Sequence, residues 1–265
     1  MNRTFDFKET WLHKVNPSVK LIWLVALFIA VLFIQNPSFL LNFTFMLTVL
    51  LFCFSGHPAK RIWWITFPFL LISFSTATSM IFFGKGEELW FHWGLISITK
   101  ESFYRGFHIG LRAFTFSVLG LLFSLTTRPV FLFYSLMQQL KLKPKYAYSF
   151  MAGIRLIPIM ISEFQIIRSA LKVRGVQKKS GLKGFYQTIK TYSVSLLSQS
   201  IRRAHRIAIA MEAKRFSAVQ QRTYYYETTF SKFDILFVLS FLIILPIAYE
   251  IGMHLPYFPV TDVRG

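Results

Sequence analysis

The sequence predicts an all-α, polytopic membrane protein with about five transmembrane helices and two long amphipathic helices on the cytoplasmic side. Two features of the 265 residues carry this prediction. Hydrophobic residues make up 54% of the chain and gather in long runs, whereas charged residues make up only 15%, against about 25% in a typical soluble domain. The basic residues are concentrated in one region between the fourth and the last apolar run.

Each of five apolar runs approaches the roughly 20 residues that a helix needs to cross the hydrocarbon core. Asn36-Pro37 ends the first run, the Gly56-His57-Pro58 turn ends the second, and Pro68 predicts a kink in the third. The runs cover residues 19–34, 39–54, 62–83, 106–125 and 233–253.

The basic residues predict the orientation, because short loops rich in Lys and Arg stay in the cytoplasm. Between residues 141 and 222 the chain has 17 Lys and Arg against 2 acidic residues, a net charge of +15. We therefore expect a multi-pass protein of the cell membrane with its N-terminus and this basic region in the cytoplasm. Five spans then put the C-terminus outside. The N-terminal stretch adds the basic residues Arg3, Lys8, Lys14 and Lys20.

The region from 129 to 222 is too polar to cross the membrane and too regularly patterned to be disordered. Residues 146–175 predict a long helix with a kink at Pro158 and an end at Gly175. After a turn-rich break at 178–184, residues 185–216 predict a second long helix. The expected domains are the first four transmembrane helices (1–127), a cytoplasmic domain (128–225), and a last transmembrane helix with its tail (226–265).

Side-chain patterns suggest how these two helices are used. Ser200, Ala204 and Ala208 form a stripe of small residues, which favours close packing between helices. Each helix runs toward a basic end, "SALKVRG" (169–175) and "AMEAKRF" (210–216). We expect Glu163 and Glu212 to pair with nearby arginines, namely Arg155, Arg168 or Arg215.

Arg112 is the one clear charge inside a predicted span. A charge at membrane depth is a functional candidate, although an arginine near a helix end can instead extend its side chain to the interface. Both interpretations stay open on sequence alone.

The sequence contains no recognisable catalytic constellation. It has no GxxxxGK[ST] phosphate loop, no HExxH or paired CxxC motif and no GxSxG elbow; Cys53 is alone, and the six histidines are scattered. We expect no catalytic, cofactor-binding or metal-binding residues, and no enzyme. The basic region leaves one alternative, a membrane-anchored protein that binds nucleic acid or anionic lipid.

Four stretches resemble the transmembrane T component of energy-coupling factor (ECF) importers, which are related to ABC transporters. They are "LHKVNPSVKL" (12–21), "GLRAFTFSVLGLLFSLTTRPVFL" (110–132), "GIRLIPIMISEFQIIRSALKVRG" (153–175) and "RRAHRIAIAMEAKRF" (202–216). The last two look like the family's paired motifs, which end in Ala-Arg-Gly and in Ala-Arg-Gly-Phe. The resemblance covers nearly the whole chain.

The resemblance implies that the two long helices are coupling helices, whose ends dock on two ABC-type ATPase subunits or a fused ATPase pair. ATP and Mg²⁺ would be bound by those ATPases and not by this chain. A separate substrate-binding membrane subunit, the S component, would carry the specificity for a vitamin or a metal. The resemblance also implies that the chain lies in the lipid bilayer of a bacterial or archaeal cell membrane and that it does not bind nucleic acid.

The docking residues implied by the resemblance are Val173, Arg174 and Gly175 in the first motif and Ala213, Lys214, Arg215 and Phe216 in the second. The second motif departs from the family's Ala-Arg-Gly-Phe. Either Arg215 becomes the anchor through a shifted helix end, or Lys214 serves as a point charge, or the two share the role. The apolar residues expected to fill the docking groove are Val173, Val176, Met211 and Phe216.

Overall fold

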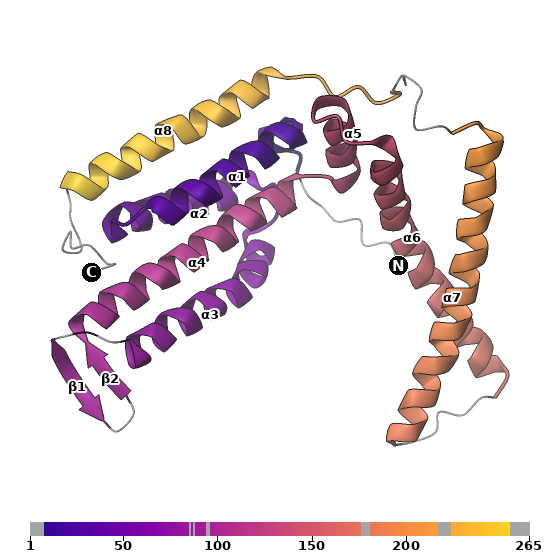
Figure 1. Cartoon of the computed structure of the whole chain (residues 1–265), viewed down its shortest axis with the longest axis horizontal. Helices are drawn as coiled ribbons and strands as arrows, with labels where there is room; N and C mark the ends of the chain where they lie inside the picture. The colour runs from indigo at the N-terminus through magenta and orange to yellow at the C-terminus, as the bar shows by residue number, and fades with distance from the viewer. Residues whose placement is uncertain are drawn as a thin grey trace. The chain divides into compact units, whose positions relative to one another are not determined.

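The computed structural model describes residues 8–84, 86, 88–93, 96–175, 181–216 and 224–254. It confirms an all-α membrane protein (Figure 1). The elements in chain order are η1 (Trp11–Lys14), α1 (Pro17–Phe33), α2 (Pro37–Phe54), α3 (Ala59–Phe83), β1 (Leu89–Trp93), β2 (Ile96–Thr99), α4 (Lys100–Thr126), α5 (Pro129–Gln139), α6 (Pro144–Val173), α7 (Leu182–Ala213) and α8 (Lys232–His254).

The chain divides into two compact units. The first, which we call the membrane unit, comprises Met1–Ser135 and Thr228–Gly265. The second, which we call the crossed-helix unit, comprises Leu136–Glu227. The chain therefore leaves the membrane unit once, after Ser135, and returns to it once, at Thr228.

An Asn-Pro-Ser sequence starts each of the first two long helices. The Asn16 side chain accepts a hydrogen bond from the backbone N–H of Ser18 at 3.0 Å, and Asn36 accepts one from Ser38 at 2.9 Å. Proline at the first helical position has its φ angle already set for a helix and lacks only an N–H that would have had no partner. The side-chain cap then satisfies one of the remaining free donors.

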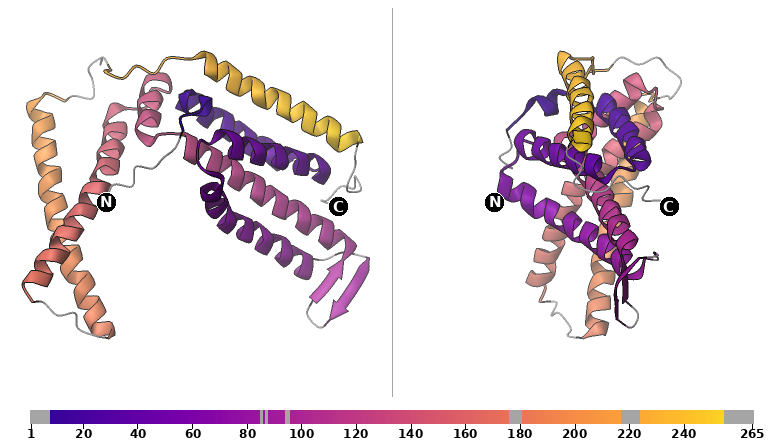
Figure 2. Two further views of the ribbon diagram at one scale, coloured as in Figure 1. Left: turned by 180° about the vertical axis from the view of Figure 1, so that it is seen from behind. Right: turned by 90° about the vertical axis from the view of Figure 1, so that its left-hand side faces the viewer.

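The core of the membrane unit lies between α1, α2, α4 and α8, which run side by side in Figures 1 and 2. Its fully buried side chains include Val31, Phe43, Leu47, Leu119 and Phe241.

The helix α3 packs closely on α4 because α4 presents glycines there. A Cβ at Gly106 would lie 2.5 Å from Ile81, and one at Gly110 would lie 2.8 Å from Ala77. Two glycines four residues apart are a frequent contact between membrane helices, since they let backbones approach. This G-x-x-x-G pattern was readable in the sequence but was missed.

A short antiparallel β-hairpin, β1 with β2, lies beside the ends of α3 and α4 (Figure 1). We predicted no helix or strand between the apolar runs 62–83 and 106–125. Thr99 is the last residue of the hairpin. Its side chain caps α4 by accepting a hydrogen bond from the N–H of Ser102 at 3.2 Å. The hairpin thus leads directly into the next helix.

Among the residues that the structure describes, five helices are long and apolar enough to cross a membrane: α2, α3, α4, α6 and α8. This set differs from the expected spans at two helices. The first predicted span is the 17-residue α1, which is apolar but shorter than the others. Conversely α6, in a region that we judged too polar to cross, reaches 30 residues with an apolar stretch of sufficient length, because only Arg155 and Glu163 carry charge between Tyr146 and Ile167.

In the crossed-helix unit, α6 and the 32-residue α7 run in opposite directions and cross (Figures 1 and 2). Pro158 lies inside α6, and the helix continues through it. Gly181, with φ of +88°, precedes α7 in a conformation that a side chain would strain.

Candidate functional site: two helix ends

The end of α6 is an exposed, regular helix terminus. Val173 is the last helical residue and its side chain is 87% exposed. Arg174 follows as the cap, with its N–H bonded to the carbonyl of Ala170 at 3.0 Å. Gly175 then adopts a φ of +69°, the left-handed conformation that glycine takes without strain. Its N–H bonds the carbonyl of Lys172 at 3.1 Å.

The end of α7 repeats this geometry with different side chains. Lys214 is the cap, and Arg215 has a φ of +51°. The N–H of Arg215 bonds the Glu212 carbonyl at 2.8 Å, and the N–H of Phe216 bonds the Met211 carbonyl at 2.9 Å. These two bonds form the Schellman motif, which normally has glycine at the left-handed position.

The two ends can therefore be compared position by position. Lys214 occupies the place of Arg174, and Arg215 occupies the place of Gly175. The helix end is not shifted to bring Arg215 to the cap. Both Lys214 and Arg215 are exposed, and this arrangement favours the interpretation in which the two cations are presented together.

The apolar residues near the ends differ in their surroundings. The Val173 side chain projects into solvent. Phe216 instead packs perpendicular to Tyr148 near the start of α6, with ring centroids 5.4 Å apart. Met211 is half-buried. Phe216 thus holds the end of α7 against α6 in the isolated chain. Val176 lies outside the described residues.

An ion pair and an aromatic contact join the two helices where they cross. Arg203 of α7 donates to Glu163 of α6, and both side chains are largely shielded from solvent. Phe164 lies 4.9 Å from Tyr192 between ring centroids. The expectation that Glu163 pairs with Arg155 or Arg168 is wrong, because the antiparallel crossing brings an arginine from α7 to it.

The stripe of small residues is largely exposed in this chain. Ser200 is half-buried, but Ala204 and Ala208 are exposed. Close packing through these two alanines is not seen within this chain.

Two cations of the membrane unit cap each other's helices. Arg112 of α4 donates to the carbonyl of Ile34, the residue that caps the end of α1, at 3.0 Å. Lys20 of α1 donates to the carbonyl of Thr126, the last residue of α4, at 3.0 Å, and to its hydroxyl at 3.2 Å. Positive charge is favourable at a helix C-terminus, where carbonyls lack partners.

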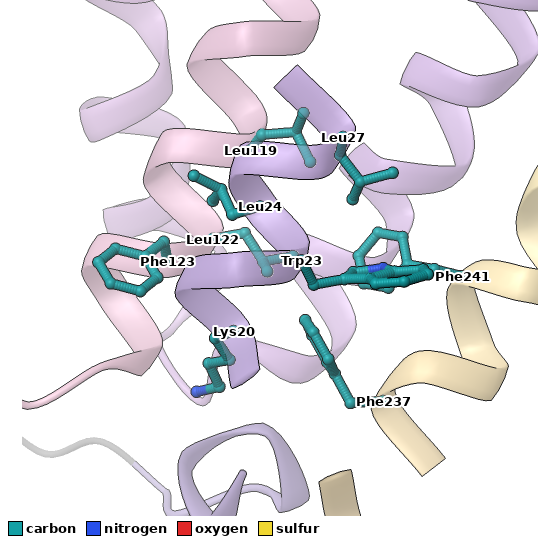
Figure 3. Close-up of a pocket in the computed structure, with 9 residues that line it drawn as sticks. All are labelled: Lys20, Trp23, Leu24, Leu27, Leu119, Leu122, Phe123, Phe237 and Phe241. Atoms are coloured by element: carbon teal, nitrogen blue, oxygen red, sulfur yellow. The ribbon is translucent and has the colours of Figure 1, made fainter. Parts of the chain in front are cut away.

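Lys20 also borders a small apolar pocket between α1, α4 and α8 (Figure 3). Its lining includes Trp23, Leu119 and Phe241, and its free space of about 10 Å³ is that of one water molecule at most. The pocket is therefore a packing gap and too small for a transported solute. Among the described residues there is also no cluster of three or more His, Cys, Asp or Glu that could hold a metal ion.

The distinguishing feature of the chain is thus a pair of crossed helices with matching cationic ends, joined to an apolar helical unit. Residues 8–225 match the sequence model of the family described as CbiQ, cobalt transport protein. The chain belongs to this family.

Several curated relatives of this CbiQ-family chain are energy-coupling factor transporter transmembrane proteins, EcfT. The one from Limosilactobacillus fermentum is 29% identical over 237 residues, which cover 85% of this chain and 87% of the relative. The one from Streptococcus thermophilus is 27% identical over 251 residues, covering 88% and 91%. The one from Listeria innocua is 29% identical over 230 residues, covering 81% and 84%.

These relatives confirm the resemblance to the T component of ECF transporters. They support an energy-coupling transmembrane subunit and give no support to the nucleic-acid alternative. The relatives are transporter subunits, which is consistent with a chain that is not itself an enzyme.

Proposed function

We propose that the ends of α6 and α7 dock on two ABC-type ATPase subunits, or on a fused ATPase pair, in the cytoplasm. The observation that supports this is the repeated geometry of the two ends, each of which presents an exposed cation directly after the last helical turn. The planar guanidinium of Arg174 suits two-pronged binding of a carboxylate, whereas the ammonium of Lys214 acts as a point charge.

The crossing provides a route for movement between the two ends. Each helix is continuous over about 45 Å or more at 1.5 Å per residue, and the Glu163–Arg203 pair fixes them to each other. A displacement of either end is therefore passed to the other helix. ATP and Mg²⁺ are bound by the ATPases, because this chain has no phosphate loop.

The substrate is captured by a separate S component, and the complex imports a vitamin or a metal ion across a bacterial or archaeal cell membrane. ATP binding closes the ATPases, shifts the coupling helices and reorients the S component. Apolar side chains exposed on α3, among them Trp64, Ile72 and Phe74, provide surface for the bilayer or for such a subunit.

The different ends suggest two different ATPase surfaces, one for each helix. The double substitution Lys214→Arg/Arg215→Gly gives α7 the ending Ala-Arg-Gly-Phe. We expect it to change which ATPase domain that end prefers, measured by competition between the two ATPases for the purified chain. An unchanged preference would contradict the assignment.

Co-purification in mild detergent tests the docking itself. We expect the wild-type chain to retain stoichiometric ATPase, and both Arg174→Ala and Lys214→Ala/Arg215→Ala to lose it. The matched control is Lys183→Ala/Lys190→Ala, which removes two exposed cations of α7 outside its end. Salt-sensitive nucleic acid in place of ATPase, or ATPase retained by both variants at the ends, would refute the proposal.

A further inference from the structure

The segment Asn16–Lys20 forms a buried polar network at the place where the chain leaves and re-enters the membrane unit. Asn16, Ser18, Ser135 and Asp234 are all buried. Ser135 is the last residue before the crossed-helix unit, and Asp234 lies six residues after the chain returns. We call these four residues the junction network.

The outgoing connection is fixed to the start of α1. The hydroxyl of Ser135 donates to the Asn16 side-chain oxygen at 2.6 Å and accepts from the backbone N–H of Ser18 at 3.1 Å. Upstream, Lys20 holds Thr126 at the end of α4. The chain is thus held on both sides of the start of α5.

The returning connection is fixed to the same residue. The N–H of Asn16 donates to one carboxylate oxygen of Asp234 at 2.7 Å, and the N–H of Ser231 donates to the other at 2.7 Å. The side-chain amide of Asn16 reaches the carbonyl of Thr229 at 3.5 Å. Asn16 therefore contacts both connections, which are almost a hundred residues apart in sequence.

The two connections are also joined within the crossed-helix unit. The side-chain amide of Gln138 donates to the carbonyl of Tyr226 at 2.7 Å. Gln138 lies three positions after Ser135, where the chain leaves the membrane unit. Tyr226 lies two positions before Thr228, where the chain returns to it. Hydrogen bonds thus pair the outgoing and returning chain in each unit separately.

We infer that the junction network makes the two connections act as one fixed pivot for the crossed-helix unit, so that its four residues are positioning residues for energy coupling. Buried hydrogen bonds are directional, and a fully satisfied network fixes one arrangement where apolar packing would permit several. If each connection could move independently, a displacement of the coupling helices would move the connections and would not reach the membrane unit. The functional part of this inference rests on the proposed function; the pivot itself does not.

Distances between spin labels test the pivot in the full chain, in lipid nanodiscs and without ATPases. In a Cys53→Ser background, one label pair at Ile29→Cys and Val194→Cys spans the two units. A second pair at Ile29→Cys and Phe74→Cys reports on the membrane unit alone. All three positions are exposed.

We expect Ser135→Ala and Asp234→Asn to widen the distance distribution between the units about twofold and to leave the distribution within the membrane unit unchanged. Ser135→Thr, which keeps the hydroxyl, should restore the narrow distribution. The control is Ser117→Ala, which removes a hydroxyl bonded only to its own helix, at Ala113. Unchanged widths in both variants would overturn the inference, as would equal widening of both label pairs, which would reveal a general loss of folding.

The same variants then test the functional part with the ATPases bound. In the wild type, we expect ATP to shift the distance between the units. In Ser135→Ala, we expect ATP still to be hydrolysed, but the distance to shift by at most half as much. A full shift in the variant would overturn the role in coupling. Failure of the wild type to bind ATPase at all would refute the proposed function while leaving the pivot measurement intact.

Discussion

Arg215 is a cation held in a backbone conformation that usually belongs to glycine. Its φ of +51° places it in the left-handed region, which costs an L-residue with a Cβ roughly 1–2 kcal/mol. The corresponding position in the first helix end is Gly175, with φ of +69°. The second end therefore sacrifices some local stability to carry an additional exposed charge.

Replacing Arg215 by glycine should consequently stabilise the end of α7. We expect Arg215→Gly to raise the free energy of unfolding by about 1 kcal/mol, measured by denaturation in detergent and followed by circular dichroism. The reciprocal change, Gly175→Arg, should lower it by a similar amount. A destabilising effect of Arg215→Gly would show that the arginine side chain makes compensating contacts.

We expect His13 to make the stability of the membrane unit sensitive to pH. Burial of the ring, followed by the nearby positive charges of Lys20 and His57, lowers the pKa of His13 below 6.5. The Nδ1 atom lies 2.9 Å from the hydroxyl and 3.3 Å from the N–H of Thr10. A proton on Nδ1 would remove the acceptor for that N–H.

The unfolded chain binds this proton more readily than the folded chain. The contribution of His13 to the free energy of unfolding should therefore be fully present above pH 6.5 and decrease as the pH falls below it. We expect the wild type to melt at a lower temperature at pH 5.5 than at pH 7.5. His13→Asn should show a smaller decrease, and His57, whose pKa is also lowered by burial, should account for part of the remainder. An identical pH dependence in His13→Asn would exclude His13 as the cause.

At the scale of the helices, the crossing of α6 and α7 depends on the ion pair between Glu163 and Arg203. The side chains are only 12% and 28% exposed, so removal of one partner leaves a poorly solvated charge. A double-mutant cycle with Glu163→Gln and Arg203→Gln should give a coupling energy of about 1–3 kcal/mol.

The membrane unit offers a matched control for this cycle. Arg128 and Glu9 also form an ion pair, but their side chains are 52% and 55% exposed. Exposed pairs contribute at most about 1 kcal/mol, so the cycle with Arg128→Gln and Glu9→Gln should give a smaller coupling energy. Equal values for the two pairs would mean that the crossing does not shield Glu163.

Sequence patterns predicted the helices well where one physical effect dominates. Long apolar runs predicted α2, α3, α4 and α8. The Asn-Pro-Ser sequences that start α1 and α2 are present in the chain, but they were not recognised as helix starts. The β-hairpin was missed because its few residues lie in a charged connection. The apolar character of α6 was underestimated because we averaged it with the basic residues around it.

Contacts between distant residues could not be read from spacing. Glu163 was assigned to arginines of its own helix because helical neighbours are the only partners that sequence alone provides. Its partner Arg203 is forty residues away. The roles of Lys20 and Arg112 as caps of each other's helices likewise depend on α1 and α4 being adjacent.

For the molecule as a whole, two connections join an apolar unit to a pair of crossed helices. The membership of the CbiQ family and the likeness to EcfT proteins agree with this division of labour. Asn16, in a stretch that resembles a family motif, hydrogen-bonds to residues of both connections.

Cysteine cross-linking can detect contact of the two helix ends with ATPase subunits. In a Cys53→Ser background, single cysteines at Val173 and Ala213, both exposed at the ends, are combined with a short bifunctional cross-linker in native membranes. The control is Val194→Cys, an exposed position near the middle of α7 and remote from both ends. We expect Val173→Cys and Ala213→Cys to form adducts with the ATPases and the control to form none. Adducts from neither end, with the ATPases present in the same membranes, would contradict it.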